Sequence, residues 1–278
     1  MKAKDLRSEL EPVWCTGCGD FGVLKALTQA LADLEVAPER LAVISGIGCS
    51  SRLPGYMKAY SFNTIHGRAL PIATGLKLAR PELTTVVVGG DGDGFSIGLG
   101  HLPHAVRRDV PLTYAVLDNG IYGLTKGQSS PTTDQESKRQ RGLAGADERP
   151  LDPVLLVLAS GAGFVARSHA GNMPHLRVMF REAISYPGFA FVHVLAGCVT
   201  YQPRGYADTL LSRSWLIPET HDPTDMSKAF ELARGDGFAL GIIHRRPPVE
   251  HPAEESVPEA EIDEITIGAE RLEDLPNE

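Results

Sequence analysis

The stretch VVVGGDGDGFSIG at residues 86–98, together with YAVLDNGIYG at residues 114–123, decides the expected fold. Each stretch begins as a short apolar run typical of a buried strand. The first run ends at glycine and Asp91, and the second ends at Asn119. Ligands of parallel α/β sheets bind beyond the carboxyl ends of the strands. One strand–helix–strand excursion between the two stretches would therefore bring Asp91 and Asn119 to neighbouring strand ends.

This pair of side chains predicts a divalent ion that pins a diphosphate. The glycines around Asp91 let the backbone approach a bulky anion, and the helix that follows offers its N-terminus. Asp91 and Asn119 supply the hard oxygen ligands that suit Mg²⁺, which also takes phosphate oxygens and water. GDG alone is a common turn, but GDG followed by 26 residues and then asparagine, each after a buried strand, is far more specific.

The rest of the chain continues an alternating pattern of strands and helices. Helices are expected at residues 21–34, 68–79, 98–108, 152–161, 173–185 and 222–234, and strands at 41–45, 84–88, 112–117, 163–168, 189–196 and 238–244. Residues 125–150 are polar and rich in glycine and serine, and we expect a long loop there. The pattern predicts an α/β fold with a mostly parallel sheet covered by helices on both faces.

The charge of the chain is concentrated at its end. The 278 residues carry a formal charge of −8, and the segment 254–278, with ten acidic residues and one basic residue, accounts for about −9 of it. We therefore expect one folded domain at residues 1–246 and an acidic, extended tail at 247–278. The near-neutral remainder has no basic stripe, which argues against nucleic-acid binding.

Neither a membrane span nor a secretory signal is expected. No apolar run approaches the roughly 20 residues of a spanning helix. The start MKAKDLRSELEPVW lacks the apolar core of a signal peptide. We expect a cytoplasmic protein without membrane association.

Four cysteines form a second pattern, made up of Cys15, Cys18, Cys49 and Cys198. A reducing cytoplasm argues against two disulfides. The first two cysteines form a C-x2-C pair within CTGCGDFG, which places two thiols on one tight turn. Such a turn suits a metal centre or a redox dithiol, and the spacing alone does not separate zinc from iron–sulfur.

Several stretches together resemble the β subunit of the 2-oxoacid:ferredoxin oxidoreductases. The resemblance rests on WCTGCGDFG, GIGCSSR, HGRALPIATGLKLA, GDGDGFSIGLGH and LDNGIYGLTKGQ, and AGCVTYQPRG and HDPTDMSKAFELA continue it. It covers about residues 12–245, and thiamin and cysteine motifs rarely occur together. It implies a thiamin diphosphate-binding fold with thiamin diphosphate, Mg²⁺ and a [4Fe–4S] cluster as cofactors.

The resemblance also implies a role for individual residues. Mg²⁺ would be held by Asp91, Asn119 and the carbonyl of Ile121. The cluster would be held by Cys15, Cys18, Cys49 and Cys198. The implied thiamin contacts are Ile47, Gly48, Cys49, Ser50, His66, Gly92, Asp93, Gly123 and Leu124. His66 is also a catalytic candidate, which the motif favours over a structural histidine. Lys126 and Arg52 are candidates for binding a substrate carboxylate, with a solvated side chain as the open alternative for each.

The implied reaction is the oxidative decarboxylation of a 2-oxoacid with coenzyme A to acyl-CoA, CO₂ and reduced ferredoxin. Overall likeness favours 2-oxoglutarate as the substrate, with pyruvate or broad 2-oxoacid specificity as alternatives. Thiamin enzymes bind the cofactor between two α/β domains, and this chain has room for one. We therefore expect an α subunit to complete the site, in a heterodimer or a dimer of heterodimers.

Two other functions are compatible with parts of the sequence. A non-catalytic module with a four-thiolate zinc site would explain the cysteines, but it would leave the intact pair of Asp91 and Asn119 without a role. A thiamin decarboxylase or synthase without a cluster would explain that pair and leave the four cysteines unexplained.

Overall fold

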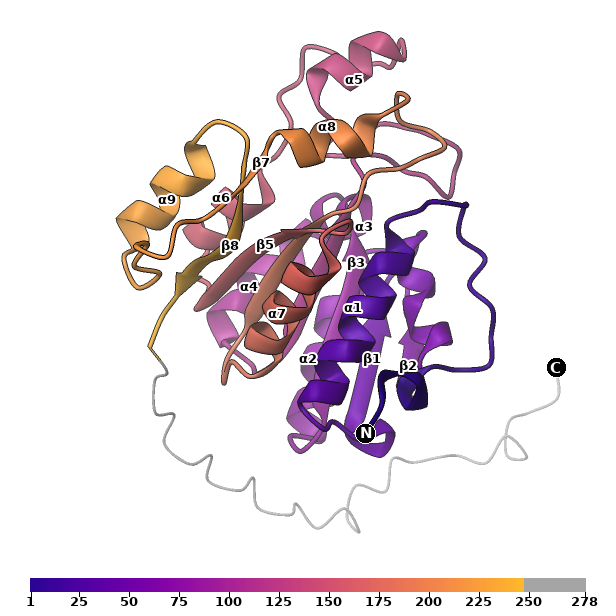
Figure 1. Ribbon diagram of the computed structural model, residues 1–278, viewed down its shortest axis with the longest axis vertical. Coiled ribbons are helices and arrows are strands. Elements are labelled where there is room, and N and C mark those ends of the chain that lie inside the picture. The colour runs from indigo at the N-terminus through magenta and orange to yellow at the C-terminus, as the bar shows by residue number, and fades with distance from the viewer. Residues whose placement is uncertain (248–278) are drawn as a thin grey trace, which may run out of the picture. The chain divides into compact units, whose positions relative to one another are not determined.

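The computed structural model describes residues 1–247, which form an eight-stranded sheet with helices on both faces (Figure 1). The strands are β1 (Leu41–Ser45), β2 (Tyr60–Asn63), β3 (Thr84–Gly90), β4 (Thr113–Asp118), β5 (Phe164–His169), β6 (Ala190–Leu195), β7 (Ser214–Leu216) and β8 (Phe238–Arg245). The α-helices are α1 (Asp20–Asp33), α2 (Ala69–Ala79), α3 (Asp91–Phe95), α4 (Leu102–Arg108), α5 (Gln135–Gln140), α6 (Pro153–Ala159), α7 (Met173–Ile184), α8 (Tyr206–Ser212) and α9 (Met226–Arg234).

The strand order is β2-β1-β3-β4-β6-β5-β8-β7. Every neighbouring pair is parallel except β5 and β8, which run antiparallel. The predicted α/β class with a mostly parallel sheet is therefore confirmed. The acidic tail predicted from residue 247 lies outside the described residues, apart from its first residue.

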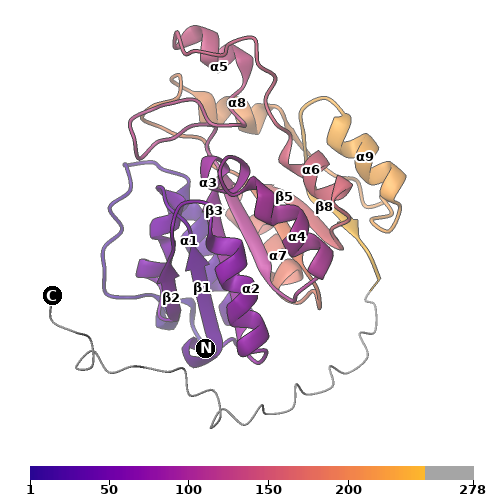
Figure 2. The ribbon, with the colours of Figure 1, turned by 180° about the vertical axis from the view of Figure 1, so that it is seen from behind.

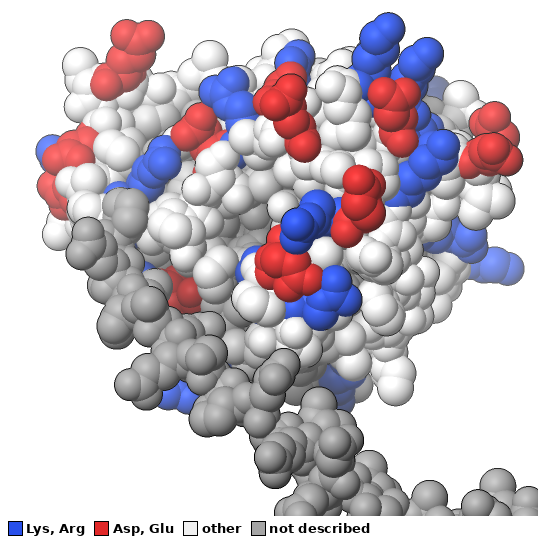
Figure 3. Space-filling view, turned by 90° about the horizontal axis from the view of Figure 1, so that it is seen from below, with Lys and Arg blue, Asp and Glu red and all other residues white. Residues whose placement is uncertain are grey.

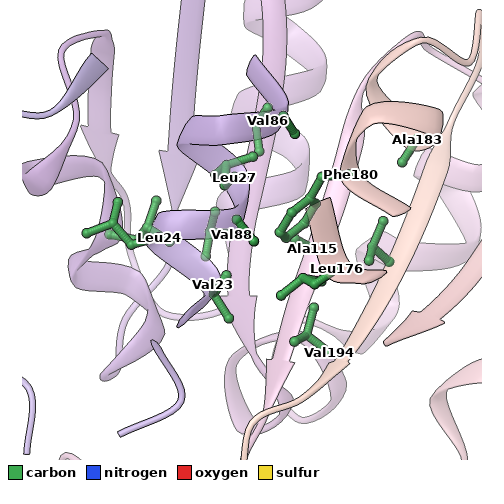
Figure 4. Packing of buried hydrophobic residues seen from close by; sticks show 14 of the residues in the cluster. Val23, Leu24, Leu27, Val86, Val88, Ala115, Leu176, Phe180, Ala183 and Val194 are labelled. Atoms are coloured by element: carbon green, nitrogen blue, oxygen red, sulfur yellow. The ribbon is translucent and has the colours of Figure 1, made fainter. Parts of the chain in front are cut away.

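Two helical layers bury the central strands. Helices α1 and α7 cover one face (Figure 1), while α2, α4, α6 and α9 contribute to the core on the other face (Figure 2). Figure 4 shows Leu27 of α1 and Phe180 of α7 directed at Val88 of β3 and its neighbours, and all three are fully buried. Strands covered on both faces need apolar residues throughout, which explains the continuous apolar runs in the sequence.

Five strands and α-helices were not expected from the sequence: β2, α3, α5, α8 and β7. All four residues of β2 are exposed, so this edge strand lacks the apolar pattern of the central strands. Helix α5 lies inside the expected long loop and is polar, and it begins where the Asp134 carboxylate accepts a hydrogen bond from the Ser137 amide at 2.8 Å. The expected helix at 98–108 is divided into a 3₁₀ turn at Leu99–His101 and α4.

The surface of the described residues carries mixed charge. On the face in Figure 3, basic and acidic side chains are interspersed over the body. Among residues 1–247 no helix is long and apolar enough to cross a membrane.

We predict that Phe180→Ala lowers the free energy of unfolding by about 3–5 kcal/mol, because it leaves a cavity between α7 and the sheet. Chemical denaturation of the purified chain measures this change. Val178→Ala is the matched control on the same helix, where the side chain is 39% exposed, and we expect a change within about 0.5 kcal/mol. Equal losses in the two variants would contradict the assigned packing of α7.

Candidate functional site

A cavity of about 260 Å³ lies at the carboxyl ends of β1, β3 and β4. Because β3 and β4 are parallel neighbours, Asp91 and Asn119 meet there, and the Asn119 amide donates to Oδ1 of Asp91 at 3.4 Å. The lining residues are Ile47, Gly48, Cys49, Ser50, His66, Gly90, Asp91, Gly92, Asp93, Asn119, Ile121, Tyr122, Gly123, Leu124 and Thr125. The structure thus brings all nine expected thiamin contacts and the three expected Mg²⁺ ligands to one cavity.

The carboxylate of Asp91 is 1% exposed and lies close to a second buried carboxylate. The hydroxyl of Thr132 lies 3.0 Å from Oδ2 of Asp91 and 2.8 Å from Oδ1 of Asp118. One hydroxyl has one proton and cannot donate to both carboxylates at once. Burial, and then the charge of Asp118, raise the pKa of Asp91 well above its ordinary value. A cation against Asp91 would remove this conflict, so the donor set fits a divalent ion.

Asp93 joins three segments of the cavity wall. Its Oδ1 accepts hydrogen bonds from the amides of Ile47 at 2.9 Å and Gly67 at 2.8 Å, and lies 2.9 Å from Nδ1 of His66. The side chain is 3% exposed. Asp93 therefore fixes the loop after β1 against the turn that precedes α2, and it anchors His66 at the edge of the cavity.

Glycine at position 92 is required by close packing. A Cβ atom there would lie 2.3 Å from the ring of Tyr122, which no side chain tolerates. The Tyr122 hydroxyl donates to the Gly92 carbonyl at 3.2 Å, so the ring seals the first turn of α3. Because α3 is short and rich in glycine, backbone groups form much of the cavity wall. Backbone amides exposed in this way suit the binding of an anion.

A second cavity, of about 220 Å³, is lined by all four cysteines: Cys15, Cys18, Cys49 and Cys198. The amide of Cys18 donates to the carbonyl of Cys15 at 3.0 Å, which closes the expected tight turn. The amide of Tyr201 donates to Sγ of Cys198 at 3.3 Å. Cys49, Asn119, Gly123 and Leu124 line both cavities, so the two share a wall.

The thiols lie in an environment that disfavours free thiolates. Burial, followed by the charge of Asp20, raises the pKa of Cys49 to about 11 and raises that of Cys18 as well. Burial also raises the pKa of Asp20, which is 4% exposed, to about 7. Such thiols become thiolates when a metal centre supplies positive charge, so the residues fit a metal-containing group.

The cavity that contains Asp91 and Asn119 is called the diphosphate cavity, and both expected substrate ligands lie apart from it. Lys126 is exposed, with a left-handed φ of 75°, and lines neither cavity. Arg52 is exposed at the cavity of the cysteines.

Sequence reasoning missed Thr132, Asp118, Tyr122 and Asp20. Thr132 stands in a polar loop without periodicity, and nothing in that segment points to Asp91. Asp20 could have been suspected, because an acidic residue directly follows the C-x2-C turn and opens a helix.

The thiamine pyrophosphate enzyme family, C-terminal TPP-binding domain, matches residues 46–194. The 2-oxoacid:ferredoxin oxidoreductase subunit beta of Saccharolobus solfataricus is 39% identical over 247 residues, which cover 84% of this chain and 81% of that one. The chain belongs to the β subunits of the 2-oxoacid:ferredoxin oxidoreductases. The resemblance found in the sequence and its thiamin diphosphate-binding fold are thereby confirmed.

Two further relatives of this β subunit are named for 2-oxoglutarate. The 2-oxoglutarate synthase subunit KorB of Archaeoglobus fulgidus is 42% identical over 206 residues, 74% of this chain and 77% of that one. A structure of 2-oxoglutarate:ferredoxin oxidoreductase from Magnetococcus marinus, with 2-oxoglutarate, coenzyme A and succinyl-CoA bound, superimposes with a TM-score of 0.85 at 43% identity. It covers 90% of this chain and 86% of that chain.

We predict that Thr132→Val weakens the binding of thiamin diphosphate about tenfold, since a hydrogen bond to a charged group contributes about 1.5 kcal/mol or more. Calorimetric titration in buffer with Mg²⁺ measures the change. Thr74→Val is the matched control, because its hydroxyl donates to the Leu70 carbonyl within α2, away from the cavity. Unchanged affinity in Thr132→Val would show that the hydroxyl does not orient Asp91.

Proposed function

We propose that this chain is the β subunit of an enzyme that decarboxylates 2-oxoglutarate oxidatively with coenzyme A to succinyl-CoA and CO₂, and passes the electrons to ferredoxin. The wall shared by the diphosphate cavity and the cavity of the cysteines is the observation that carries this function. A short path between the two cavities is what single-electron transfer requires. The Magnetococcus marinus structure, which contains 2-oxoglutarate and succinyl-CoA, supports the choice of substrate.

Mg²⁺ would be held by Asp91, Asn119 and the carbonyl of Ile121. The amide of Ile121 donates to Oδ1 of Asn119 at 3.0 Å, which orients this segment at the cavity. The buried carboxylate of Asp91 supports the assignment, since the Asn119 amide lies as far as 3.4 Å from it and Asp118 competes for the hydroxyl of Thr132. Thiamin diphosphate supplies the carbanion chemistry when bound. The residues of this chain would hold the diphosphate in place. His66, which Asp93 anchors, would orient the rings of thiamin.

A [4Fe–4S] cluster fits the cysteines better than a single zinc ion. Zinc holds four thiolates at about 2.3 Å from one point. Within residues 1–247, no three His, Cys, Asp or Glu side chains are gathered so as to hold a single ion. The four thiols instead line a cavity of about 220 Å³, which supports a larger group. The intact pair of Asp91 and Asn119, which has no role in a zinc module, disfavours the alternative of a non-catalytic zinc module.

An α subunit would complete the active site. The wall of the diphosphate cavity includes exposed apolar side chains, Ile47 at 45% and Leu124 at 47% exposure. Ile65 and Ile97, close by in sequence to His66 and Asp93, are 77% and 55% exposed. Such side chains favour burial against a partner. Lys126 and Arg52, which are exposed, would bind the substrate carboxylate within the assembled complex.

The four cysteines are free thiols, and their use for a cluster supports a reducing compartment, which we propose to be the cytoplasm. Ferredoxin as electron acceptor and coenzyme A as acyl acceptor complete the set of proposed partners.

We predict that Cys198→Ser lowers the iron content and the EPR signal of the reduced cluster while thiamin diphosphate binding changes less than twofold. Cys198 lines the cavity of the cysteines and is absent from the diphosphate cavity. Metal analysis and calorimetry on the same anaerobic preparation measure both quantities. A full iron complement would remove Cys198 from the ligand set, and stoichiometric zinc in the wild type would favour the zinc site.

The proposed reaction is tested by methyl viologen reduction with the αβ complex, coenzyme A and a panel of 2-oxoacids. We expect the largest kcat/KM for 2-oxoglutarate and no turnover by the β chain alone, because one α/β domain cannot enclose thiamin. A larger kcat/KM for pyruvate would overturn the substrate assignment. Equal turnover without the α subunit would overturn the shared active site.

A further inference from the structure

A third cavity, of about 530 Å³, lies beyond the ends of β4, β5 and β6 and shares no lining residue with the diphosphate cavity. Residues of α5 and α8, which lie beyond these strand ends in Figures 1 and 2, contribute to its wall. Arg167, His193 and Asp118 come from the strands, while Arg204 and Arg213 flank α8. The cavity is large enough for a small metabolite.

Arg167 is a buried cation with a single, long ion pair in the described part of the protein. The side chain is 2% exposed, and its Nε donates to Nδ1 of His193 at 3.1 Å. The nearest carboxylate oxygen, Oδ1 of Asp152, is 3.8 Å from one terminal nitrogen and already accepts from two amides at the start of α6. Within residues 1–247 neither terminal nitrogen has a hydrogen-bond partner. A guanidinium has five donors, so four remain for a ligand.

Three of the four acidic residues of the wall are engaged elsewhere, and the fourth, Asp152, forms the long ion pair with Arg167. Glu136 accepts a hydrogen bond from the Gln140 side chain at 2.9 Å. Asp118 takes part in contacts with the Gly120 amide, the Thr132 hydroxyl and His193. Asp134 accepts from the backbone at the start of α5. Because Nδ1 of His193 accepts from Arg167, its Nε2 carries the proton donated to Asp118 at 2.9 Å. Among the carboxylates of the wall, Asp152 is therefore the one that pairs with Arg167, at 3.8 Å.

Further positive charge gathers at the same cavity. Arg213 lies over the ring of Phe238 at 5.1 Å, and Arg167 lies 5.5 Å from the same ring. Arg204 and Arg213 are exposed and have no ion pair within the part of the chain that the structure describes. Three guanidinium groups thus line one cavity, and one of them is desolvated.

We propose that this cavity binds an oxyanion, the carboxylate or phosphate group of a small metabolite, through the terminal nitrogens of Arg167. A buried charge with only one distant ion-pair partner among the described residues, here Asp152 at 3.8 Å, is unfavourable, and a guanidinium matches two oxygens of a carboxylate or phosphate at once. Arg204 and Arg213 attract the anion at the exposed part of the wall. The site is separate from the diphosphate cavity, because none of these three arginines lines the latter.

The test uses the complex of the full chain with its α subunit, saturated with thiamin diphosphate and Mg²⁺ so that the diphosphate cavity is filled. Calorimetric titration with inorganic phosphate and, separately, with malonate distinguishes the two sources of the oxyanion. We expect one site per β subunit for at least one probe. Arg167→Lys keeps the charge but loses the paired donors, and should weaken binding at least tenfold.

Two further variants keep the result interpretable if Arg167→Lys is unstable. Arg213→Gln changes an exposed side chain of the same cavity and should weaken binding about threefold. Arg234→Gln, at an exposed arginine outside the cavity, should leave binding unchanged. Crystals soaked in selenate should show anomalous density beside Arg167. Failure of both probes to bind at millimolar concentration, or equal binding in the wild type and Arg213→Gln with no density at Arg167, would overturn the site.

Discussion

The buried carboxylate of Asp91 is the constraint on which the site depends. It stands at the end of β3 with almost no exposure, next to Asp118 and a single hydroxyl that serves both carboxylates. Two carboxylates so placed are unfavourable without a cation. The parallel pairing of β3 with β4 brings Asn119 to the same point and makes a shared cation possible. The sheet thus creates a charge conflict that the proposed divalent ion would resolve.

The loop after β1 connects the diphosphate cavity, where Asp91 lies, to the cavity of the cysteines. Asp93 holds the amide of Ile47, and two residues later Cys49 lines both cavities. The carbonyl of Cys49 accepts from Nε1 of Trp14 at 2.7 Å, which fixes the loop against the segment that carries Cys15. One short loop therefore fixes the position of the diphosphate cavity relative to the cavity of the cysteines.

The meeting of Asp91 and Asn119 at neighbouring strand ends could be predicted from the sequence. The apolar runs indicated the strands, and the motif of GDG and asparagine indicated the residues that follow them. Asp91 and Asn119 follow continuous apolar runs, and a parallel sheet has one place where such residues meet. Cys198 could be assigned only through the family resemblance, since its long separation from Cys49 has no local signal. Thr132 could not be predicted, because its role depends on how a polar loop folds back over two strand ends. Lys126 stays a prediction from its motif, because it is exposed outside both cavities of this chain and its role depends on the assembled complex.

The central claim is that the two cavities form one electron path within this chain. The most direct measurement mixes the anaerobic αβ complex with 2-oxoglutarate in the absence of coenzyme A and records the EPR spectrum. The account predicts a reduced-cluster signal that requires thiamin diphosphate and is lost in Cys198→Ser. An oxidised cluster after consumption of 2-oxoglutarate, or a signal that persists in Cys198→Ser, would contradict it.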